Sequence, residues 1–277
     1  MKDKIAEKVL LLIALSAILS LALITFFIFQ QGIPLIFKAG LGNFLSLKWA
    51  PTKAGFGILS MVVGSLLVTI GALAVGIPFG LAGAIFLAEF SSKTIQKTLK
   101  PIIELLAGIP SVVYGFIGIV ILVPFIRNTF GGPGFSVLAA SIILGIMILP
   151  TILSISYDAL LAVPNTYREG SYAVGATKWQ TIVMLLLPAA RSGIVAGIIL
   201  GMGRAVGETM AVIMIAGNAL KIPGSILDSV RTLTSTIALE LGYAAGDHRA
   251  ALFACGCVLF LIIIVLNAVA IRITGKK

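Results

Sequence analysis

Histidine and cysteine, the residues that most often bind metals or act as nucleophiles, are nearly absent from this sequence. Its 277 residues include one histidine and two cysteines. His248 has no neighbour in sequence that would complete a metal or catalytic set, so it is interpreted as a solvated loop residue. Cys255 and Cys257 lie in an apolar segment, on different faces of a helix, which is typical of core residues rather than of a disulfide. The sequence therefore predicts neither a metal site nor a cofactor.

Charged residues are also scarce. Only 11% of the residues are charged and 59% are hydrophobic, and the mean hydropathy is +1.15. This composition excludes a water-soluble globule and indicates an integral membrane protein. The net charge of +10 does not indicate nucleic-acid binding, because the basic residues are spread along the chain without an aromatic-rich cluster. No Gly-x-x-x-x-Gly-Lys-Ser/Thr run is present, so no nucleotide site is expected.

Long apolar runs predict an all-α membrane protein with six transmembrane helices. A helix needs about 20 apolar residues to cross the hydrocarbon core. Most lysines and arginines fall on one side of the spans, which predicts that both termini are cytoplasmic. No stretch between spans is long enough for a further domain, so 1–277 is expected to be one domain. The six candidate spans are about 9–29, 58–87, 102–126, 136–163, 192–217 and 251–271.

A polar segment at about 164–190, between the fourth and fifth candidate spans, has the pattern of two short capped helices. Thr166-x-x-Glu169 and Thr177-x-x-Gln180 both have capping-box spacing, in which a hydroxyl and a carboxylate or amide satisfy the free N–H groups of a helix start. The charge bias places this segment in the cytoplasm. An amphipathic hairpin lying on lipid headgroups is the alternative interpretation of such a pattern.

Gly175 and Pro188 frame the second of these short helices. Gly175 falls where the first helix should end, since a positive φ is least costly for glycine. Pro188 restricts the backbone before the next span. Between them lie Ala176, Thr177 and Trp179, and the hairpin is expected to insert into a groove of another protein.

The fifth candidate span contains two opposite charges within an apolar helix. Arg204 and Glu208 are four residues apart, and a charge in mid-membrane costs about 2.5–3.5 kcal/mol on insertion scales, so both must face protein or water. Glycines recur every four residues along the same span and predict close packing against neighbouring helices. They are Gly193, Gly197 and Gly201, with Gly203 and Gly207 as a second pair.

An anion pathway explains these charges better than a structural ion pair does. The spacing would allow Arg204 and Glu208 to neutralise each other, but apolar residues would pack there at lower cost. An arginine fork suits a tetrahedral oxyanion, and a carboxylate can accept a hydrogen bond from a protonated one or hold the arginine when the site is empty. We assign Thr209 to the same pathway, together with Pro110 and Ser111 at a proline in the third span. Pro78 and Pro150 are also expected to interrupt their spans.

The polar segment resembles the coupling loop of ABC importer permeases. Their pattern is Glu-Ala-Ala, three residues, Gly, nine residues, Ile-x-Leu-Pro, and Glu169, Gly175, Leu187 and Pro188 match it. Within these permeases the chain resembles the phosphate-specific family and its PstC-type subunit, over about residues 49 to 250. The matching segments are Trp49-Ala-Pro51, Phe56-Gly57, Gly64 to Thr69, Leu106 to Gly115, Pro164 to Pro188, Gly203 to Val212 and Gly217-Asn218.

This resemblance implies a type I importer fold in the cytoplasmic membrane of a prokaryote. It implies a homologous PstA-type permease, a cytoplasmic ABC ATPase dimer and an external phosphate-binding protein as partners, besides inorganic phosphate and membrane lipid. ATP would then be hydrolysed by a partner and not by this chain. Glu169 would help to fix the first short helix and its ATPase contact, and Gly175 would set the angle between the two helices.

Four alternative functions are weighed against the same residues. A permease for sulfate or molybdate would share the loop and the arginine. A gradient-driven transporter would need no ATPase dock. A lipid-acting enzyme within the membrane would need a nucleophile with a base, or a metal, at membrane depth. A membrane scaffold or sensor would leave the charges of the fifth span unexplained.

Overall fold

The computed structural model describes the backbone of residues 2–275 and the side chains of residues 6–272. The chain forms two compact units. The first comprises Met1–Leu59 and Thr236–Leu261, and the second comprises Ser60–Ser235 and Ile262–Lys277. Both units consist mainly of helices, as the apolar runs predict.

The first unit is built on α1 (Lys2–Ala39) and the beginning of α14 (Gly246–Gly275). The helix α1 continues well past the expected end at residue 29. In this extension Gly32 lies close to α14, since a Cβ at this position would lie 2.7 Å from Cys257 Sγ. Cys257 Sγ donates a hydrogen bond to the Ile28 carbonyl at 3.5 Å. Cys255 and Cys257 are both buried, as expected for core residues.

Short elements complete this unit beyond the end of α1. They are α2 (Leu41–Phe44), β1 (Trp49–Ala50), the 3-10 turn η1 (Pro51–Lys53) and β2 (Gly55–Phe56), and the two strands pair antiparallel. The side chain of Glu240, at the end of α13 (Leu233–Glu240), accepts a hydrogen bond from Trp49 Nε1 at 3.0 Å and lies 2.8 Å from His248 Nε2. The interpretation of His248 as a solvated loop residue is therefore wrong: it lies in α14 and pairs with a buried carboxylate.

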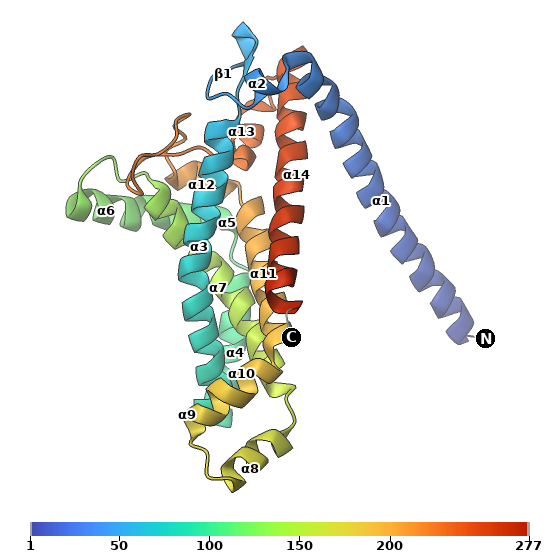
Figure 1. Ribbon diagram of the computed structural model, residues 1–277, viewed down its shortest axis with the longest axis vertical. Coiled ribbons are helices and arrows are strands. Elements are labelled where there is room, and N and C mark those ends of the chain that lie inside the picture. Colours follow the sequence, from blue (N-terminus) through green and yellow to red (C-terminus); the bar gives the residue numbers. More distant parts are fainter. Residues whose placement is uncertain (1, 276–277) are drawn as a thin grey trace. The chain divides into compact units, whose positions relative to one another are not determined.

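The helix α7 (Val137–Leu161) is the centre of the second unit and packs against α3 (Leu59–Ile85), α4 (Lys93–Ala107) and α11 (Arg191–Gly207) (Figure 1). Its inward residues, among them Leu144, Ile148 and Ile152, belong to an apolar cluster that also includes residues of α3 and α11. The remaining elements are the π-helical turn η2 (Phe86–Phe90), α5 (Ser111–Ile117), η3 (Gly118–Leu122), α6 (Val123–Phe130), α8 (Asn165–Ala173), α9 (Lys178–Thr181), η4 (Ile182–Leu186), α10 (Leu187–Ala189) and α12 (Met210–Ile215).

Five helices in the described chain are long and apolar enough to span a membrane. A bent pair of helices, Lys178–Ala189 and Arg191–Gly207, makes a sixth span if it is counted as one. The expected all-α membrane fold is thus confirmed, with two corrections. The third span begins at Ser111 and not near 102, because the apolar residues before Gly108 belong to the separate helix α4. The segment 192–217 is not one helix but breaks after Gly207. The five spans are Ala6–Ala39, Leu59–Phe90, Ser111–Phe130, Val137–Leu161 and Gly246–Arg272.

Of the three prolines expected to interrupt spans, Pro110 alone lies at a break, directly before α5. Pro78 and Pro150 lie inside α3 and α7, which continue through them. Membrane helices tolerate internal proline where neighbouring helices re-satisfy the freed backbone groups.

Candidate functional site

The segment 164–190 forms the expected pair of short helices, α8 and α9, and α9 continues through η4 and α10 to Ala189. The second predicted capping box is confirmed: Thr177 Oγ1 accepts from the Gln180 N–H, and Gln180 Oε1 accepts from the Thr177 N–H at 2.8 Å. The first is wrong. The helix α8 begins at Asn165 with Pro164 as its N-cap residue, so Thr166 lies within the helix and does not cap its start.

Gly175 ends α8 as predicted. Its φ is +84°, and its N–H donates to the Tyr172 carbonyl while the Ala176 N–H donates to the Ser171 carbonyl, at 3.0 and 3.1 Å. These two bonds form a Schellman motif, which satisfies the last carbonyls of a helix through a left-handed residue. The glycine thus sets the turn between α8 and α9.

The tip of this hairpin presents large apolar side chains to its surroundings. Val174 is 84% exposed and Trp179 is 62% exposed. Glu169, Thr177 and Pro188 are also exposed, while Ala176 is half-buried. A groove of about 750 Å³ lies between α8 and the helix that begins with α9. Such a surface is typical of a docking site for another protein.

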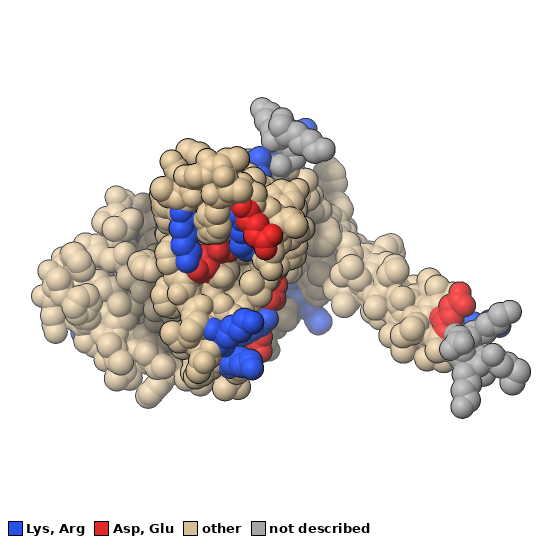
Figure 2. All heavy atoms as spheres, turned by 90° about the horizontal axis from the view of Figure 1, so that it is seen from below, with Lys and Arg blue, Asp and Glu red and all other residues tan. Residues whose placement is uncertain are grey.

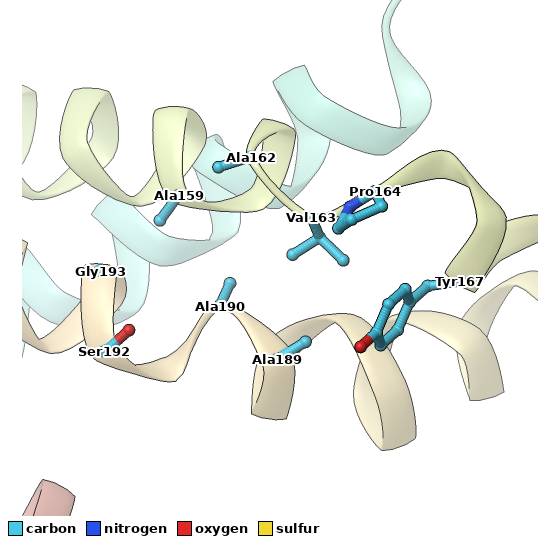
Figure 3. A pocket seen from close by; sticks show the side chains of 9 residues that line it. All are labelled: Ala159, Ala162, Val163, Pro164, Tyr167, Ala189, Ala190, Ser192 and Gly193. Carbon is cyan, nitrogen blue, oxygen red and sulfur yellow. The ribbon is translucent and has the colours of Figure 1, made fainter.

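An elbow connects the hairpin to α11. The axes of Lys178–Ala189 and Arg191–Gly207 differ by 71°, and Pro188 lies in the last turn before the bend. A pocket of about 300 Å³ lies inside the elbow, lined mainly by small side chains, with the Tyr167 ring and Val163 at one end (Figure 3). The elbow is therefore not filled by side chains.

The helix α11 uses one of its two glycine rows to approach α7. A Cβ on Gly193, Gly197 or Gly201 would meet Ala159, Ile155 or Ile152 respectively, so this part of the prediction is confirmed. A Cβ on Gly203 or Gly207 would meet no atom within 4 Å.

Arg204 and Glu208 do not pair across a helical turn: α11 ends at Gly207, and Glu208, which follows it, has an extended backbone and bonds elsewhere. Its Oε1 accepts hydrogen bonds from the Thr209 and Ala211 N–H groups at 3.1 and 3.2 Å. The carboxylate thus satisfies free donors at the start of α12. Among the described side chains Arg204 and Glu208 form no ion pair, so the sequence spacing alone is misleading here.

Arg204 instead reaches the break between α4 and α5. Its Nη2 donates to the Ala107 carbonyl at 3.2 Å, and the Tyr114 hydroxyl donates to the neighbouring Leu106 carbonyl at 2.9 Å. Pro110 and Ser111 begin α5 directly after this break. The fold therefore brings the guanidinium to the segment that sequence reasoning assigned to the same pathway.

The helices that follow the two breaks pack closely. A Cβ on Gly115 of α5 would lie 3.2 Å from Ala211 Cα of α12. Irregular backbone at membrane depth is tolerated where it is buried in protein or lines a water-filled cavity. Two breaks, one cation and one carboxylate thus occur in one region of the second unit. The described side chains contain no group of three metal-ligating residues.

Sequence reasoning missed Glu89, which forms an ion pair with Arg168 of α8. Glu89 Oε1 lies 2.7 Å from Arg168 Nη2, and the two side chains are 5% and 15% exposed. The signal available in the sequence was an acidic residue at the very end of an apolar run.

Residues 76–274 match the family described as binding-protein-dependent transport system inner membrane component. The chain belongs to this family. As a member it is a multi-pass protein of the prokaryotic inner membrane, and it belongs to a family of transport components and not of enzymes.

Comparison with curated relatives shows which members of this family the chain is similar to. This chain is 47% identical over 236 residues to the probable ABC transporter permease protein YqgH of Bacillus subtilis. The matched region covers 83% of this chain and 76% of that protein. The chain is 36% identical over 252 residues to the phosphate transport system permease protein PstC of Mesorhizobium japonicum, covering 83% and 77%. The resemblance to PstC-type permeases is thus confirmed.

Solved structures share the fold. A bacterial ABC transporter that imports the acidic polysaccharide alginate matches with a TM-score of 0.62 and 19% identity, over 95% of this chain and 96% of that one. The type I importer fold expected from the coupling-loop pattern is thereby confirmed.

Proposed function

We propose that this chain is the permease subunit of an ATP-driven importer of inorganic phosphate, with 1–277 acting as one domain. The assignment of phosphate as the substrate rests on the similarity to relatives named phosphate transport system permease protein, such as that of Mesorhizobium japonicum. The Bacillus subtilis relative is named without a substrate, so the substrate has to be tested directly against other tetrahedral oxyanions.

Arg204 is the proposed anion-binding group of the translocation pathway. Its guanidinium makes a hydrogen bond to one backbone carbonyl and no ion pair with Glu208, which leaves donors for an oxyanion. Glu208 and Thr209 at one helix break, and Pro110 and Ser111 at the other, complete the proposed pathway.

The loop 164–190 is the proposed coupling element. Glu169, Gly175, Ala176, Thr177, Trp179 and Pro188 are its proposed contact and shaping residues. A cytoplasmic ABC ATPase dimer would receive it, since a chain without a nucleotide-binding loop needs a partner to hydrolyse ATP. A homologous PstA-type permease would complete the pathway, and an external phosphate-binding protein would deliver the substrate.

Uptake of labelled phosphate tests the proposal. Cells that lack this chain, and the same cells with it restored, are compared with and without excess sulfate or molybdate. Uptake that depends on the chain and resists both competitors is the expected result. Uptake that sulfate or molybdate abolishes would assign the permease to that oxyanion instead.

The role of Arg204 is tested with Arg204→Gln. The matched control is Arg127→Gln, because Arg127 also donates to a backbone carbonyl, that of Pro133, but lies outside the proposed pathway. We expect the Arg204 variant alone to lose uptake while its assembly stays normal. Equal uptake by wild type and by this variant would show that Arg204 is not the anion site.

A further inference from the structure

The π-helical turn η2 at the end of α3 contacts both helices of the loop 164–190. Arg168 of α8 donates from Nε and Nη2 to Glu89 Oε1, at 3.2 and 2.7 Å. Lys178 of α9 places its Nζ 4.4 Å from the centre of the Phe90 ring. Two side chains of one turn thus receive two cations of the loop. Figure 2 shows basic and acidic side chains close together on the face seen from below.

Arg168 also closes the end of α7. Its Nη2 donates to the Leu160 carbonyl at 3.0 Å, and its Nη1 donates to the Val163 carbonyl at 2.9 Å. The last carbonyls of a helix have no partner within the helix, and a guanidinium can satisfy several of them from one fixed plane. One side chain therefore joins α8 to the ends of α3 and α7.

The π-helical geometry of η2 is part of this arrangement. The Ser91 N–H bonds to the Phe86 carbonyl, five residues back, which widens the turn that carries Glu89. Such turns are rare and often occur at functional sites. Within the loop, Ser171 Oγ lies 2.9 Å from Thr181 Oγ1 and joins α8 to α9, so that the hairpin and η2 form one connected body.

An ion pair that is largely shielded from water, as that of Glu89 and Arg168 is, seldom adds much to stability. Removing two charges from water costs free energy that their attraction seldom recovers, and apolar residues of similar volume would often serve as well. A buried pair does resist separation, because loss of one partner leaves an uncompensated charge. It therefore suits a connection that must hold while its parts move.

We propose that Glu89 and Arg168 are positioning residues that transmit movement of the coupling loop to α3 and α7. This inference rests on the proposed function, in which an ATPase moves the loop. When the loop shifts, η2 and the end of α7 follow because the guanidinium holds both. A loop without this ion pair would still dock on the ATPase through its exposed tip, but would no longer move the spans.

The test uses the whole transporter reconstituted in vesicles, with labelled phosphate uptake and ATP hydrolysis measured together. Glu89→Gln keeps the size of the side chain and removes the charge, and Arg168→Gln removes the cation. The matched control is Asp158→Asn, which breaks the exposed pair between Asp158 and Lys100, 2.8 Å apart. We expect uptake per ATP to fall by about 5–150-fold in both test variants, the range typical of coupling between two sites, and to stay unchanged in the control.

Assembly distinguishes this role from a purely structural one. Variants that co-purify with the ATPase and hydrolyse ATP at the wild-type rate, but transport little, would support the proposal. Variants in which uptake and hydrolysis fall in proportion would overturn it, because they would report lost assembly. Arg168→Lys keeps the charge without the planar fork and should fall between wild type and Arg168→Gln.

Spin labels give a readout that does not depend on the substrate. Labels replace the exposed side chains Tyr172 on α8 and Phe79 on α3. In the wild-type complex we expect a narrow distance distribution both without nucleotide and with ADP and vanadate, and in Glu89→Gln a broad one. An equally narrow distribution in the variant would refute the proposal, whereas failure of wild-type phosphate uptake would refute the proposed substrate alone.

Discussion

Glu208 combines two roles that substitution can separate. Its Oε1 holds two N–H groups at the start of α12. Its Oε2 accepts no hydrogen bond from the described residues, which leaves this oxygen for the proposed pathway. Glu208→Gln keeps an oxygen for the N–H groups and removes the charge, while Glu208→Ala removes both.

The loss of stability expected in Glu208→Ala follows from the two hydrogen bonds. Replacing a side chain that caps a helix start by alanine costs about 0.5–2 kcal/mol. For a chain of this size a loss of 1 kcal/mol lowers the melting temperature by about 2–4 °C. Glu208→Gln should show no such shift, since its amide oxygen can accept the same bonds.

Thermal unfolding of the purified transporter in detergent, together with labelled phosphate uptake, measures both roles. Glu208→Ala should melt earlier and transport little, and Glu208→Gln should melt normally and transport little. Glu104→Ala, which removes an exposed carboxylate of α4, serves as the control with neither effect. An unchanged melting temperature in Glu208→Ala, or an equal loss in Glu208→Gln, would refute the capping argument.

Three further predictions concern packing, backbone and pH. Gly193→Ala would bring its Cβ against Ala159 and cost about 1–3 kcal/mol by overpacking, and adding Ala159→Gly should restore the melting temperature; no recovery in the double variant would contradict this. Gly175→Ala should cost about 1 kcal/mol in thermal unfolding, because φ is +84° while the space around it is open, and a loss several times larger would point to a steric clash. The Gly224 N–H holds the pKa of the Asp228 carboxyl below its ordinary 3.8. The carboxylate therefore stabilises its loop above pH 3.8, and this stabilisation is lost as the pH falls through the lowered pKa. Normalised amide protection of Gly224 that is the same at neutral and acidic pH would contradict this prediction.

Local patterns predicted most of the helices. Apolar runs located α1, α3, α7 and α14, since helix length in a membrane is set by the thickness of the hydrocarbon. The Thr177 capping box and the turn at Gly175 were predictable because each depends on residues within four positions. The start of the third span was not, because hydropathy does not distinguish the end of α4 from a crossing helix.

Contacts between residues far apart in the sequence could not be predicted from the sequence. Glu89 and Arg168 are 79 positions apart, and no spacing rule joins them. Trp49, Glu240 and His248 meet in the same way through the fold of the first unit. For the proposed pathway, the sequence located Arg204 and Glu208 but assumed an unbroken helix. The extended backbone at Glu208 depends on its own side chain bonding forward to α12, which competes with the helical continuation.

The two glycine rows of α11 separate folding from assembly. Gly193, Gly197 and Gly201 lie against α7, so enlarging them disturbs this chain whether or not any partner is present. Gly203 and Gly207 have open space around them within the described chain. An alanine at either position should therefore cause no steric clash in the isolated subunit, and its higher helix propensity favours the helix. Any loss seen only in the complete transporter at these two positions would therefore measure a contact that comes from another molecule. The helix thus carries its own internal standard for distinguishing a misfolded subunit from one that cannot assemble.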